Sequence, residues 1–225
     1  MRVGLLEDDP DHAAMTVRLL QAAGHSCQVY GTGELFLRGT LHDTFDVLIL
    51  DWALPDMTGL QVLEAIRQRQ NNVPVLFLTS RDEEQDIVEA LSHGADDFLV
   101  KPPRAAELLA RLMALKRRGD KTGVTQVLSV PPYEFDVATN SVAVNGQPVE
   151  LTQRQFQLSM VLFGNIGRLL SRSYLLETVW GLNAQVQTRT LDIHISQLRS
   201  VLNLPAHGWR ITSVYAHGYR LEPLV

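Results

Sequence analysis

Short apolar runs and longer amphipathic segments alternate through the first half of the chain. The strand-sized runs, rich in Val, Ile, Leu and Phe, lie at 3–6, 27–30, 45–50, 73–79 and 98–101. Segments whose apolar residues recur with helical spacing lie at 12–22, 33–41, 59–69, 83–92 and 104–118. Buried strands that alternate with helices are typical of a doubly wound α/β fold. We therefore predict a five-stranded parallel sheet covered by helices on both faces.

The pattern changes after residue 118. Apolar periodicity is lost in the next eight residues, which begin with the polar, glycine-containing stretch Gly119-Asp120-Lys121-Thr122-Gly123. A chain of 225 residues is long enough for two ordinary cores. We predict a first domain at 1–118, a linker at 119–126 and a second domain at 127–225.

The second domain combines hairpins with helices. Residues 142–149 predict an antiparallel hairpin, because Asn145 and Gly146 tolerate the positive φ angles of a two-residue turn. The predicted helices extend from Thr152 to about Gly164, from Arg172 to Trp180 and from Thr188 to Leu202. A last hairpin is centred near 215–218. This combination predicts an α+β winged-helix domain.

Charge differs between the halves. The net charge is −5, but residues 1–119 carry 12 basic and 18 acidic side chains, whereas residues 120–225 carry 8 and 7. An acidic first half suits a metal or phosphoryl site, and a second half near neutrality is a weak electrostatic footprint for a nucleic-acid binder.

The start of the chain and its cysteine content indicate the compartment. Met1 is followed closely by the acidic Glu7-Asp8-Asp9, without a basic start and an apolar signal region, and no apolar run is long enough for a membrane span. Cys27 is the only cysteine, which excludes an internal disulfide and a multi-cysteine metal site. We expect a soluble, cytoplasmic protein with Cys27 in its core.

Acidic residues follow two of the predicted strands. Glu7 and Asp8 close the first strand and Asp51 closes the third. Doubly wound topology brings these carboxylates together at the carboxyl edge of the sheet. Because they would repel one another, the cluster needs a cation, and hard oxygen ligands suit Mg²⁺. Asp51 would attack a phosphoryl donor while the metal offsets negative charge on the transferred group.

A cation and a hydroxyl follow the remaining strands. Lys101 ends the fifth strand, where its ammonium can pair with a phosphoryl oxygen, and Thr79 ends the fourth, where its hydroxyl can donate a hydrogen bond to that group. Pro102 permits a cis Lys101-Pro102 bond that would help to aim the lysine, and the sequence leaves cis and trans both open.

Residues 1–118 resemble the receiver domain of two-component response regulators. The matching motifs are Glu7-Asp8-Asp9, Asp51 with Leu54-Pro55-Asp56-Met57-Thr58-Gly59, Thr79-Ser80, Gly94-Ala95-Asp96-Asp97-Phe98 and Lys101-Pro102. The resemblance implies a flavodoxin-like fold and phosphorylation of Asp51 by a sensor histidine kinase. It also implies that Asp8, Asp51 and the Ala53 carbonyl hold Mg²⁺, with Glu7 assisting through water. Thr79 and Phe98 would form the switch pair, with phenylalanine where relatives often carry tyrosine.

Residues 127–223 resemble the winged-helix effector domain of the OmpR/PhoB family. The matching segments include Leu151-Thr152-Gln153-Arg154-Gln155-Phe156, Leu175-Leu176-Glu177-Thr178-Val179-Trp180-Gly181, Arg189 to Arg199 and Gly218-Tyr219-Arg220-Leu221. The last helix places Leu191, Ile195, Leu198 and Leu202 on its core face. The residues that we expect to contact DNA are Arg172, Arg189, Thr190, His194, Gln197, Arg199 and Tyr215. Arg and Gln side chains read base edges, Arg172 and Arg199 would hold phosphates, and the wing with Tyr215 would follow a minor groove.

Two departures from the family pattern bear on DNA binding. The recognition helix carries Ser196, Gln197 and Ser200 where relatives have basic residues, and the wing has Tyr215-Ala216 in place of an Arg-Gly pair. Fewer phosphate contacts weaken binding and flatten its dependence on salt. We expect binding to depend on a dimer, since two weak half-site contacts reinforce each other.

In this family the dimer surface lies on the fourth helix, fifth strand and fifth helix. The candidate members here are Asp96, Asp97, Glu107 and Arg111. Ile87 and Val88 occupy positions of the fourth helix where relatives often carry basic residues, so part of the charge network is replaced by apolar side chains.

The favoured hypothesis is a transcription regulator in which phosphorylation of Asp51 drives homodimerisation and binding to direct repeats in double-stranded promoter DNA, with RNA polymerase as a partner. It is not an enzyme beyond the Mg²⁺-dependent phosphorylation and dephosphorylation of its own Asp51. An alternative is a phospho-regulated protein-interaction module with weak DNA affinity. A phosphatase or haloacid-type enzyme with an aspartate nucleophile would need a substrate cap, and no segment supplies one.

Overall fold

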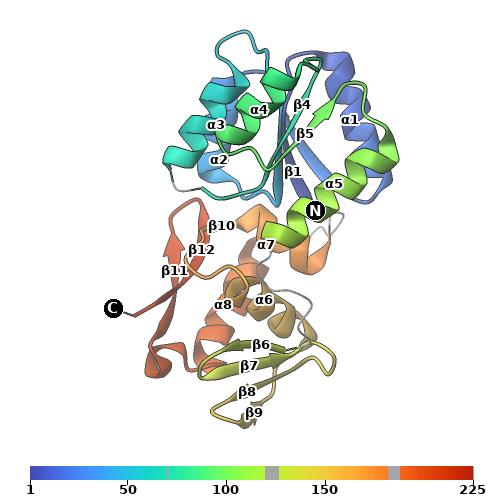
Figure 1. The fold of residues 1–225 in the computed structure, drawn as a ribbon. Coiled ribbons are helices and arrows are strands. Elements are labelled where there is room, and N and C mark those ends of the chain that lie inside the picture. Colours follow the sequence, from blue (N-terminus) through green and yellow to red (C-terminus); the bar gives the residue numbers. More distant parts are fainter. Residues whose placement is uncertain (70, 120–126, 182–187, 225) are drawn as a thin grey trace. The chain divides into compact units, whose positions relative to one another are not determined.

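The computed structural model describes residues 1–69, 71–119, 127–181 and 188–224. The chain divides into two compact units, Met1–Lys121 and Thr122–Val225 (Figure 1). Most of the predicted linker, residues 120–126, lies outside the described residues.

The first unit is built on a parallel five-stranded sheet in the order β2-β1-β3-β4-β5. Its strands are β1 (Arg2–Leu6), β2 (Ser26–Tyr30), β3 (Val47–Leu50), β4 (Val75–Thr79) and β5 (Asp97–Val100). Its helices are α1 (Pro10–Ala22), α2 (Gly33–His42), α3 (Gly59–Gln68), α4 (Glu84–Ser92) and α5 (Ala105–Gly119). The predicted doubly wound fold is therefore confirmed. The predicted strand and helix bounds differ from the observed ones by at most two residues.

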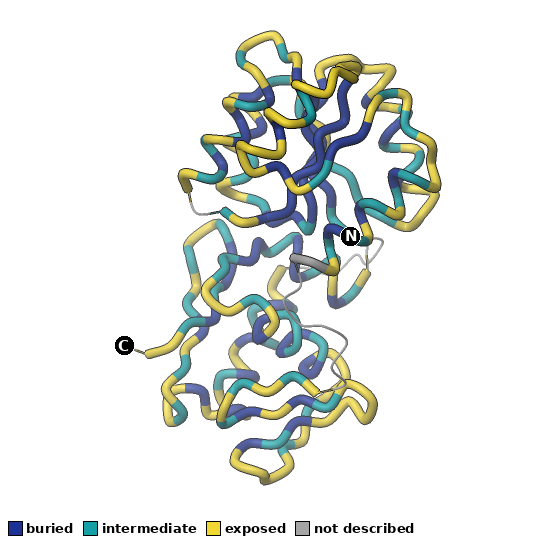
Figure 2. Tube along the Cα trace, viewed as in Figure 1, coloured by how far each residue is buried: buried dark blue, intermediate teal, exposed yellow. Residues whose placement is uncertain are grey.

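Helices cover both faces of this sheet, as the central strands require. Every residue of β3 and β4 is buried, so neither face can be left in water (Figure 2). On one face, Ala13 and Leu20 of α1 and Leu108, Leu112 and Leu115 of α5 pack in one cluster. On the other, Phe36, Val62, Leu63, Ile66 and Ala90 bring α2, α3 and α4 together.

The described part of the second unit contains two antiparallel sheets and three α-helices, and strand β10 of the second sheet lies between α6 and α7 in sequence. The first sheet comprises β6 (Val127–Val130), β7 (Tyr133–Asp136), β8 (Ser141–Val144) and β9 (Gln147–Val149). The helices are α6 (Gln153–Phe163), α7 (Arg172–Trp180) and α8 (Thr188–Val201). The second sheet has the order β10-β12-β11 and comprises β10 (Leu170–Ser171), β11 (Trp209–Val214) and β12 (Gly218–Pro223). The predicted helices and both hairpins are present, and β6, β7 and β10 are additional strands.

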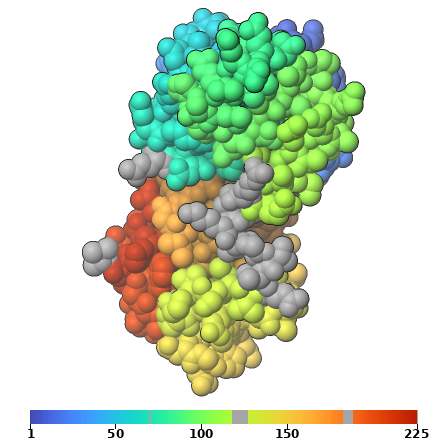
Figure 3. Space-filling view, in the orientation of Figure 1, coloured from blue at the N-terminus to red at the C-terminus, as the bar shows by residue number. Residues whose placement is uncertain are grey.

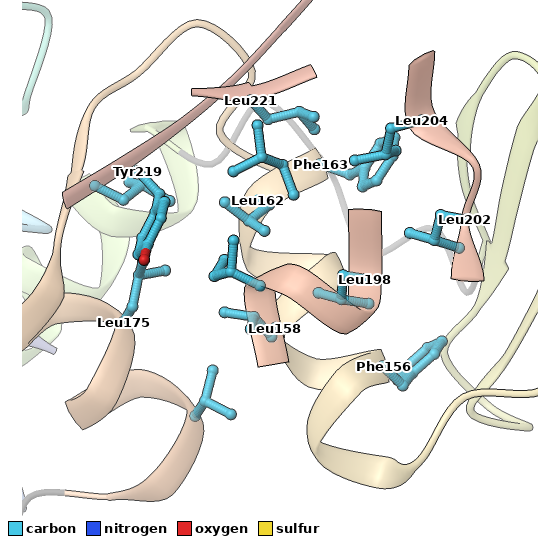
Figure 4. Packing of buried hydrophobic residues seen from close by; sticks show 14 of the residues in the cluster. Phe156, Leu158, Leu162, Phe163, Leu175, Leu198, Leu202, Leu204, Tyr219 and Leu221 are labelled. Atoms are coloured by element: carbon cyan, nitrogen blue, oxygen red, sulfur yellow. The ribbon is translucent and has the colours of Figure 1, made fainter. Parts of the chain in front are cut away.

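One apolar cluster holds the second unit together (Figure 4). Phe156, Leu158 and Leu162 line the inner side of α6, and Leu191, Ile195 and Leu198 line that of α8, as the helical spacing predicts. Tyr219 and Leu221 of β12 and Leu175 of α7 belong to the same cluster. The hairpin β11–β12, called the wing below, is thus fastened to the helices through its buried residues.

Gly59 gives the first prediction. A Cβ at Gly59 would lie 2.1 Å from the Asp51 carbonyl oxygen, whereas one at the exposed Gly31 would meet nothing within 4 Å. The clash is with backbone, which has no rotamer by which to escape. We expect Gly59→Ala to lower the free energy of unfolding by about 2–3 kcal/mol, and the matched control Gly31→Ala to change it by less than about 0.5 kcal/mol. Urea denaturation of the two variants checks this, and equal stabilities would contradict it.

Candidate functional sites

Three carboxylates meet at the carboxyl edge of the sheet in the first unit. Glu7 directly follows β1 and Asp51 directly follows β3, and the register pairs Leu6 with Leu50, so the two side chains emerge beside each other. One oxygen from each of Glu7, Asp8 and Asp51 lies within 4.8 Å of the others. Glu7 and Asp51 are buried, whereas Asp8 is exposed. The sheet topology alone therefore gathers this cluster.

Lys101 partly neutralises the cluster. It follows β5, and its Nζ lies 2.7 Å from Asp51 Oδ2 and 2.5 Å from Glu7 Oε2. Burial opposes the charge of Lys101, but its hydrogen bonds to the two carboxylates outweigh this, and its pKa lies above the usual range. Burial also raises the pKa of Glu7, in spite of Lys101. The Lys101-Pro102 peptide bond is cis, one of the two alternatives that the sequence left open.

The donor set fits a hard divalent cation. One ammonium faces three carboxylates, so the cluster keeps an excess of negative charge. Apart from the ion pairs with Lys101 and, at 3.7 Å, with His12, the buried oxygens of Glu7 have no hydrogen-bond partner among the described residues. A hydrated cation would satisfy those oxygens, and carboxylates with water are the ligands that Mg²⁺ prefers.

The loop after Asp51 is held in place from a distant helix. Asp56 accepts hydrogen bonds from the backbone N–H groups of Gly33 and Glu34, both at 2.9 Å, at the N-terminus of α2. These bonds lower the pKa of Asp56. Ala53 also forms an isolated bridge with Thr58 in the same loop. The loop that carries the Ala53 carbonyl is therefore held by the hydrogen bonds of Asp56 and by the Ala53–Thr58 bridge. The sequence analysis did not identify this function of Asp56.

Thr79 and Phe98 lie where the sequence predicts. Thr79 ends β4 and is buried, and its hydroxyl accepts a hydrogen bond from the Arg81 backbone N–H at 3.4 Å. Phe98 in β5 is 8% exposed, and its ring stacks on that of Phe77 with the centroids 6.5 Å apart. The Thr79 hydroxyl is thus bonded to the next loop rather than to Asp51.

Arg81 is a further residue at the rim that the sequence analysis did not single out. Its guanidinium lies over the Trp52 ring, 4.9 Å from the centroid, and binds Asp86 of α4 at 2.8 Å. Trp52 directly follows Asp51, and its backbone N–H donates to Asp51 Oδ1 at 2.6 Å. Arg81 therefore links α4 to the residue next to the candidate phosphoacceptor.

In the second unit, α8 presents an exposed face opposite its buried one. Arg189 and Gln197 are exposed and Thr190 is half-buried. Ile193 is 51% exposed on this helix, and Tyr215 at the turn of the wing is 94% exposed. The sequence analysis predicted contacts with DNA for all of these except Ile193.

Four residues predicted to contact DNA are engaged within the unit. The exposed Gln197 is one of them, because its Oε1 accepts a hydrogen bond from Gln155 Nε2 at 3.1 Å. Arg172 binds Asp192 at 2.5 Å, and Arg199 donates to the Ile211 carbonyl at 2.6 and 3.2 Å. His194 packs against Trp180 with the ring centroids 5.3 Å apart, and burial lowers its pKa.

Comparison with known proteins accounts for both units. Residues 3–113 match the response regulator receiver domain family, and residues 146–221 match the family described as transcriptional regulatory protein, C terminal. The sensory transduction protein RegX3 of Mycolicibacterium smegmatis is 38% identical over 97% of each chain. The phosphate regulon transcriptional regulatory protein PhoB of Rhizobium meliloti is 34% identical over 98% of each chain.

The chain belongs to the OmpR/PhoB family of response regulators. It is a two-component regulator with a receiver domain and a DNA-binding effector domain, so its partners include a kinase and DNA. The predicted family, fold class and general function are confirmed.

Solved structures agree for the receiver domain. The receiver domain of the Francisella response regulator 1452 is 29% identical, with a TM-score of 0.51, and the match covers 52% of this chain and 98% of that one. A two-component response regulator from Clostridium difficile is 26% identical, with a TM-score of 0.51, and the match covers 54% and 99%. Within the described ranges, no helix has the length and apolar character of a membrane span.

The predicted dimer residues belong to β5, to α5 and to the residue before β5. The segments α4, β5 and α5 are the green part of the receiver in Figure 3. Arg111 of α5 binds Asp97 and Glu107, both at 2.9 Å. Asp96 instead binds Arg67 at 3.0 Å and accepts a hydrogen bond from the Val75 backbone N–H. A hollow of about 350 Å³ on α4, β5 and α5 is lined by Ile87, Leu91, Asp97, Phe98, Leu99, Val100, Glu107 and Arg111.

The ion pairs of Lys101 give the second prediction. Its side chain is 7% exposed, and without it Glu7 and Asp51 would face each other without a cation. We expect Lys101→Met to lower the metal-free stability by about 3 kcal/mol. Added Mg²⁺ should then stabilise this variant more than the wild type, because the metal takes over the neutralisation.

Lys116→Met is the matched control. Lys116 is 37% exposed and lies 3.7 Å from Asp46, so its loss should cost less than about 1 kcal/mol. Thermal unfolding with and without Mg²⁺ measures both effects. An equal Mg²⁺ response in Lys101→Met and the wild type would refute the prediction.

Proposed function

We propose that a sensor histidine kinase phosphorylates Asp51 and that this modification controls dimerisation and DNA binding. The observation that carries the proposal is the buried contact of Asp51 with Lys101, 2.7 Å away, beside two further carboxylates. In the proposed site, Asp8, Asp51 and the Ala53 carbonyl hold Mg²⁺, and Glu7 assists through water. When bound, the metal offsets negative charge on the phosphoryl group.

Asp51 and Lys101 carry the transfer itself. A carboxylate oxygen of Asp51 forms the new bond to phosphorus while the bond from phosphorus to the imidazole nitrogen of the kinase histidine breaks. The Lys101 ammonium, which already lies against Asp51 Oδ2, then pairs with an oxygen of the transferred group. Hydrolysis of the acyl phosphate by water restores the carboxylate and releases phosphate.

Thr79 and Phe98 convert this local change into a change at the dimer face. We propose that the Thr79 hydroxyl leaves the Arg81 N–H to donate to the phosphoryl oxygen. The space that it leaves admits the ring of Phe98, which already lines the hollow between α4 and α5. Repacking at this hollow alters the surface that carries Asp97, Glu107 and Arg111.

Dimerisation through that face would pair two effector domains on direct repeats. Asp97, Glu107 and Arg111 form a connected charge cluster, and the exposed Leu91 of α4 lines the same hollow. Asp96 is a peripheral member, because its carboxylate is bonded to Arg67. RNA polymerase is the further partner proposed for the DNA-bound dimer.

The exposed face of α8 and the tip of the wing are the proposed DNA surface. Arg189 and Gln197 would contact base edges, with Thr190 beside them, and exposed Ile193 suits the methyl group of thymine. Tyr215 would lie in the neighbouring minor groove.

One observation favours the second candidate, a protein-interaction module. Ile193 is half exposed on the presented face of α8, while Arg172 and Arg199 are bonded within the domain, so this face is poorer in positive charge than the sequence suggests. An apolar, weakly charged face suits a protein partner as well as a base edge.

Selection from random-sequence DNA tests the proposed function. The full-length protein is used with and without Mg²⁺ and beryllofluoride, a phosphoryl mimic at Asp51. We expect spaced direct repeats to be enriched only with the mimic, and not for Asp51→Asn under any condition, because this variant lacks the acceptor carboxylate. Asp11→Asn makes the same change at an exposed carboxylate in the first turn of α1; it is the control and should behave as the wild type. Equal enrichment in both conditions would remove the gating, and no enrichment would favour the protein-interaction module.

The dimer face has its own prediction. We expect Arg111→Glu to weaken dimerisation with beryllofluoride about tenfold, because three acidic side chains would then be adjacent on this face. Arg38→Glu, on the exposed side of α2, makes the same charge change elsewhere and should leave the dimer unchanged. Sedimentation equilibrium measures both, and equal dimerisation constants would exclude this face.

A further inference from the structure

Two groups of contacts join the recognition helix α8 to the wing. Asp192 binds Arg172 at 2.5 Å and accepts a hydrogen bond from the Tyr219 hydroxyl, which lies in β12. Arg199 donates two hydrogen bonds to the Ile211 carbonyl, which lies in β11. Asp192 and Arg199 are seven residues apart, two helical turns, and therefore lie on the same side of α8. That side of α8 contacts both strands of the wing.

The cluster at Asp192 also includes α7. Arg172 is the first residue of α7, its guanidinium lies over the Tyr219 ring at 5.1 Å from the centroid, and its Nη2 lies 3.3 Å from the Tyr219 hydroxyl. The Arg172 backbone N–H donates to the His217 carbonyl near the turn of the wing. One arginine thus joins α7, α8 and the wing.

Burial and charge show that this cluster is well satisfied. Tyr219 is 4% exposed and its ring lies beside Leu175 in the core (Figure 4). Burial opposes the charges of Arg172 and Asp192, yet their hydrogen bonds and mutual attraction raise the pKa of Arg172 and lower that of Asp192. Arg172 therefore already has a carboxylate and an aromatic face as partners.

The cluster lies between the two parts of the proposed DNA surface. Asp192 is next to the exposed Ile193 on α8, and Tyr219 pairs with Ser213, two residues before the exposed Tyr215. A shift of the wing relative to α8 would break the contacts of Asp192 and Arg199 together. Holding two contact surfaces in a fixed relative position lowers the ordering cost of binding.

We propose that Arg172, Asp192, Tyr219 and Arg199 form a clamp of positioning residues that fixes the wing relative to the recognition helix and does not itself neutralise DNA phosphates. The inference rests on the proposed DNA binding of this domain. Arg172 and Arg199 would then bind groups within the domain instead of DNA phosphates.

Removal of one hydroxyl tests the clamp. Tyr219→Phe deletes the donor to Asp192 and keeps the buried ring, while Thr212→Val deletes a hydroxyl that bonds Glu222 within the wing and does not reach α8. Affinities of the full-length protein with beryllofluoride are measured on the selected DNA over a range of salt. We expect Tyr219→Phe to bind about tenfold more weakly with an unchanged salt slope. Thr212→Val should bind as the wild type.

Two further variants separate positioning from direct contact. Tyr215→Ala should cost less affinity in the Tyr219→Phe background than in the wild type, because the wing is no longer held against DNA. Arg172→Gln should keep the wild-type salt slope, whereas a phosphate contact would lower it by about 0.9. Additive losses, or a lower slope for Arg172→Gln, would overturn the clamp.

Hydrogen exchange of residues 209–223 tests the clamp in the absence of DNA. Their amides should exchange faster in Tyr219→Phe and not in Thr212→Val, and equal exchange in both would overturn the clamp. Wild-type protein that selects no DNA sequence would refute the proposed function, and the exchange result would then decide on the clamp by itself.

Discussion

The contact of one buried ammonium with two buried carboxylates is the constraint on which the receiver domain depends. Lys101 lies within 2.7 Å of both Asp51 and Glu7, and both carboxylates are buried. The three residues come from the ends of β5, β3 and β1, so the strand order itself assembles them. Because the cluster keeps an excess of negative charge, it attracts a cation. In the function proposed above, that cation would offset the negative charge of the incoming phosphoryl group.

Charged side chains also hold the loops around the site in place. Asp56 accepts from the N-terminus of α2, and Arg81 lies between Trp52 and Asp86. These contacts tie the loops that carry Asp51 and Thr79 to separate helices. In the function proposed above, a change at Asp51 would reach α4 through Trp52 and Arg81, whose side chains are already in contact.

The sequence predicted most of the receiver and less of the effector surface. Uninterrupted apolar runs such as Val47–Leu50 identify buried parallel strands, and residues directly after such strands must meet at one edge. β6 and β7 were missed because Pro131-Pro132 interrupts the pattern between them, and β10 was missed because it has only two residues. Asp56 and Arg199 bond to backbone groups. Every residue has such groups, so the sequence does not show which of them are the partners. Charge patterns therefore suggested DNA contacts for arginines whose acceptors lie within the domain.

The clamp proposed for Arg172 and Arg199 would affect how this regulator searches a genome. Attraction to DNA of arbitrary sequence comes almost entirely from cations that face phosphates. A regulator that uses two arginines internally is retained less by non-cognate DNA, travels shorter distances along it and returns sooner to solution. Promoter occupancy then follows the number of active molecules closely, since fewer of them are held on the rest of the chromosome.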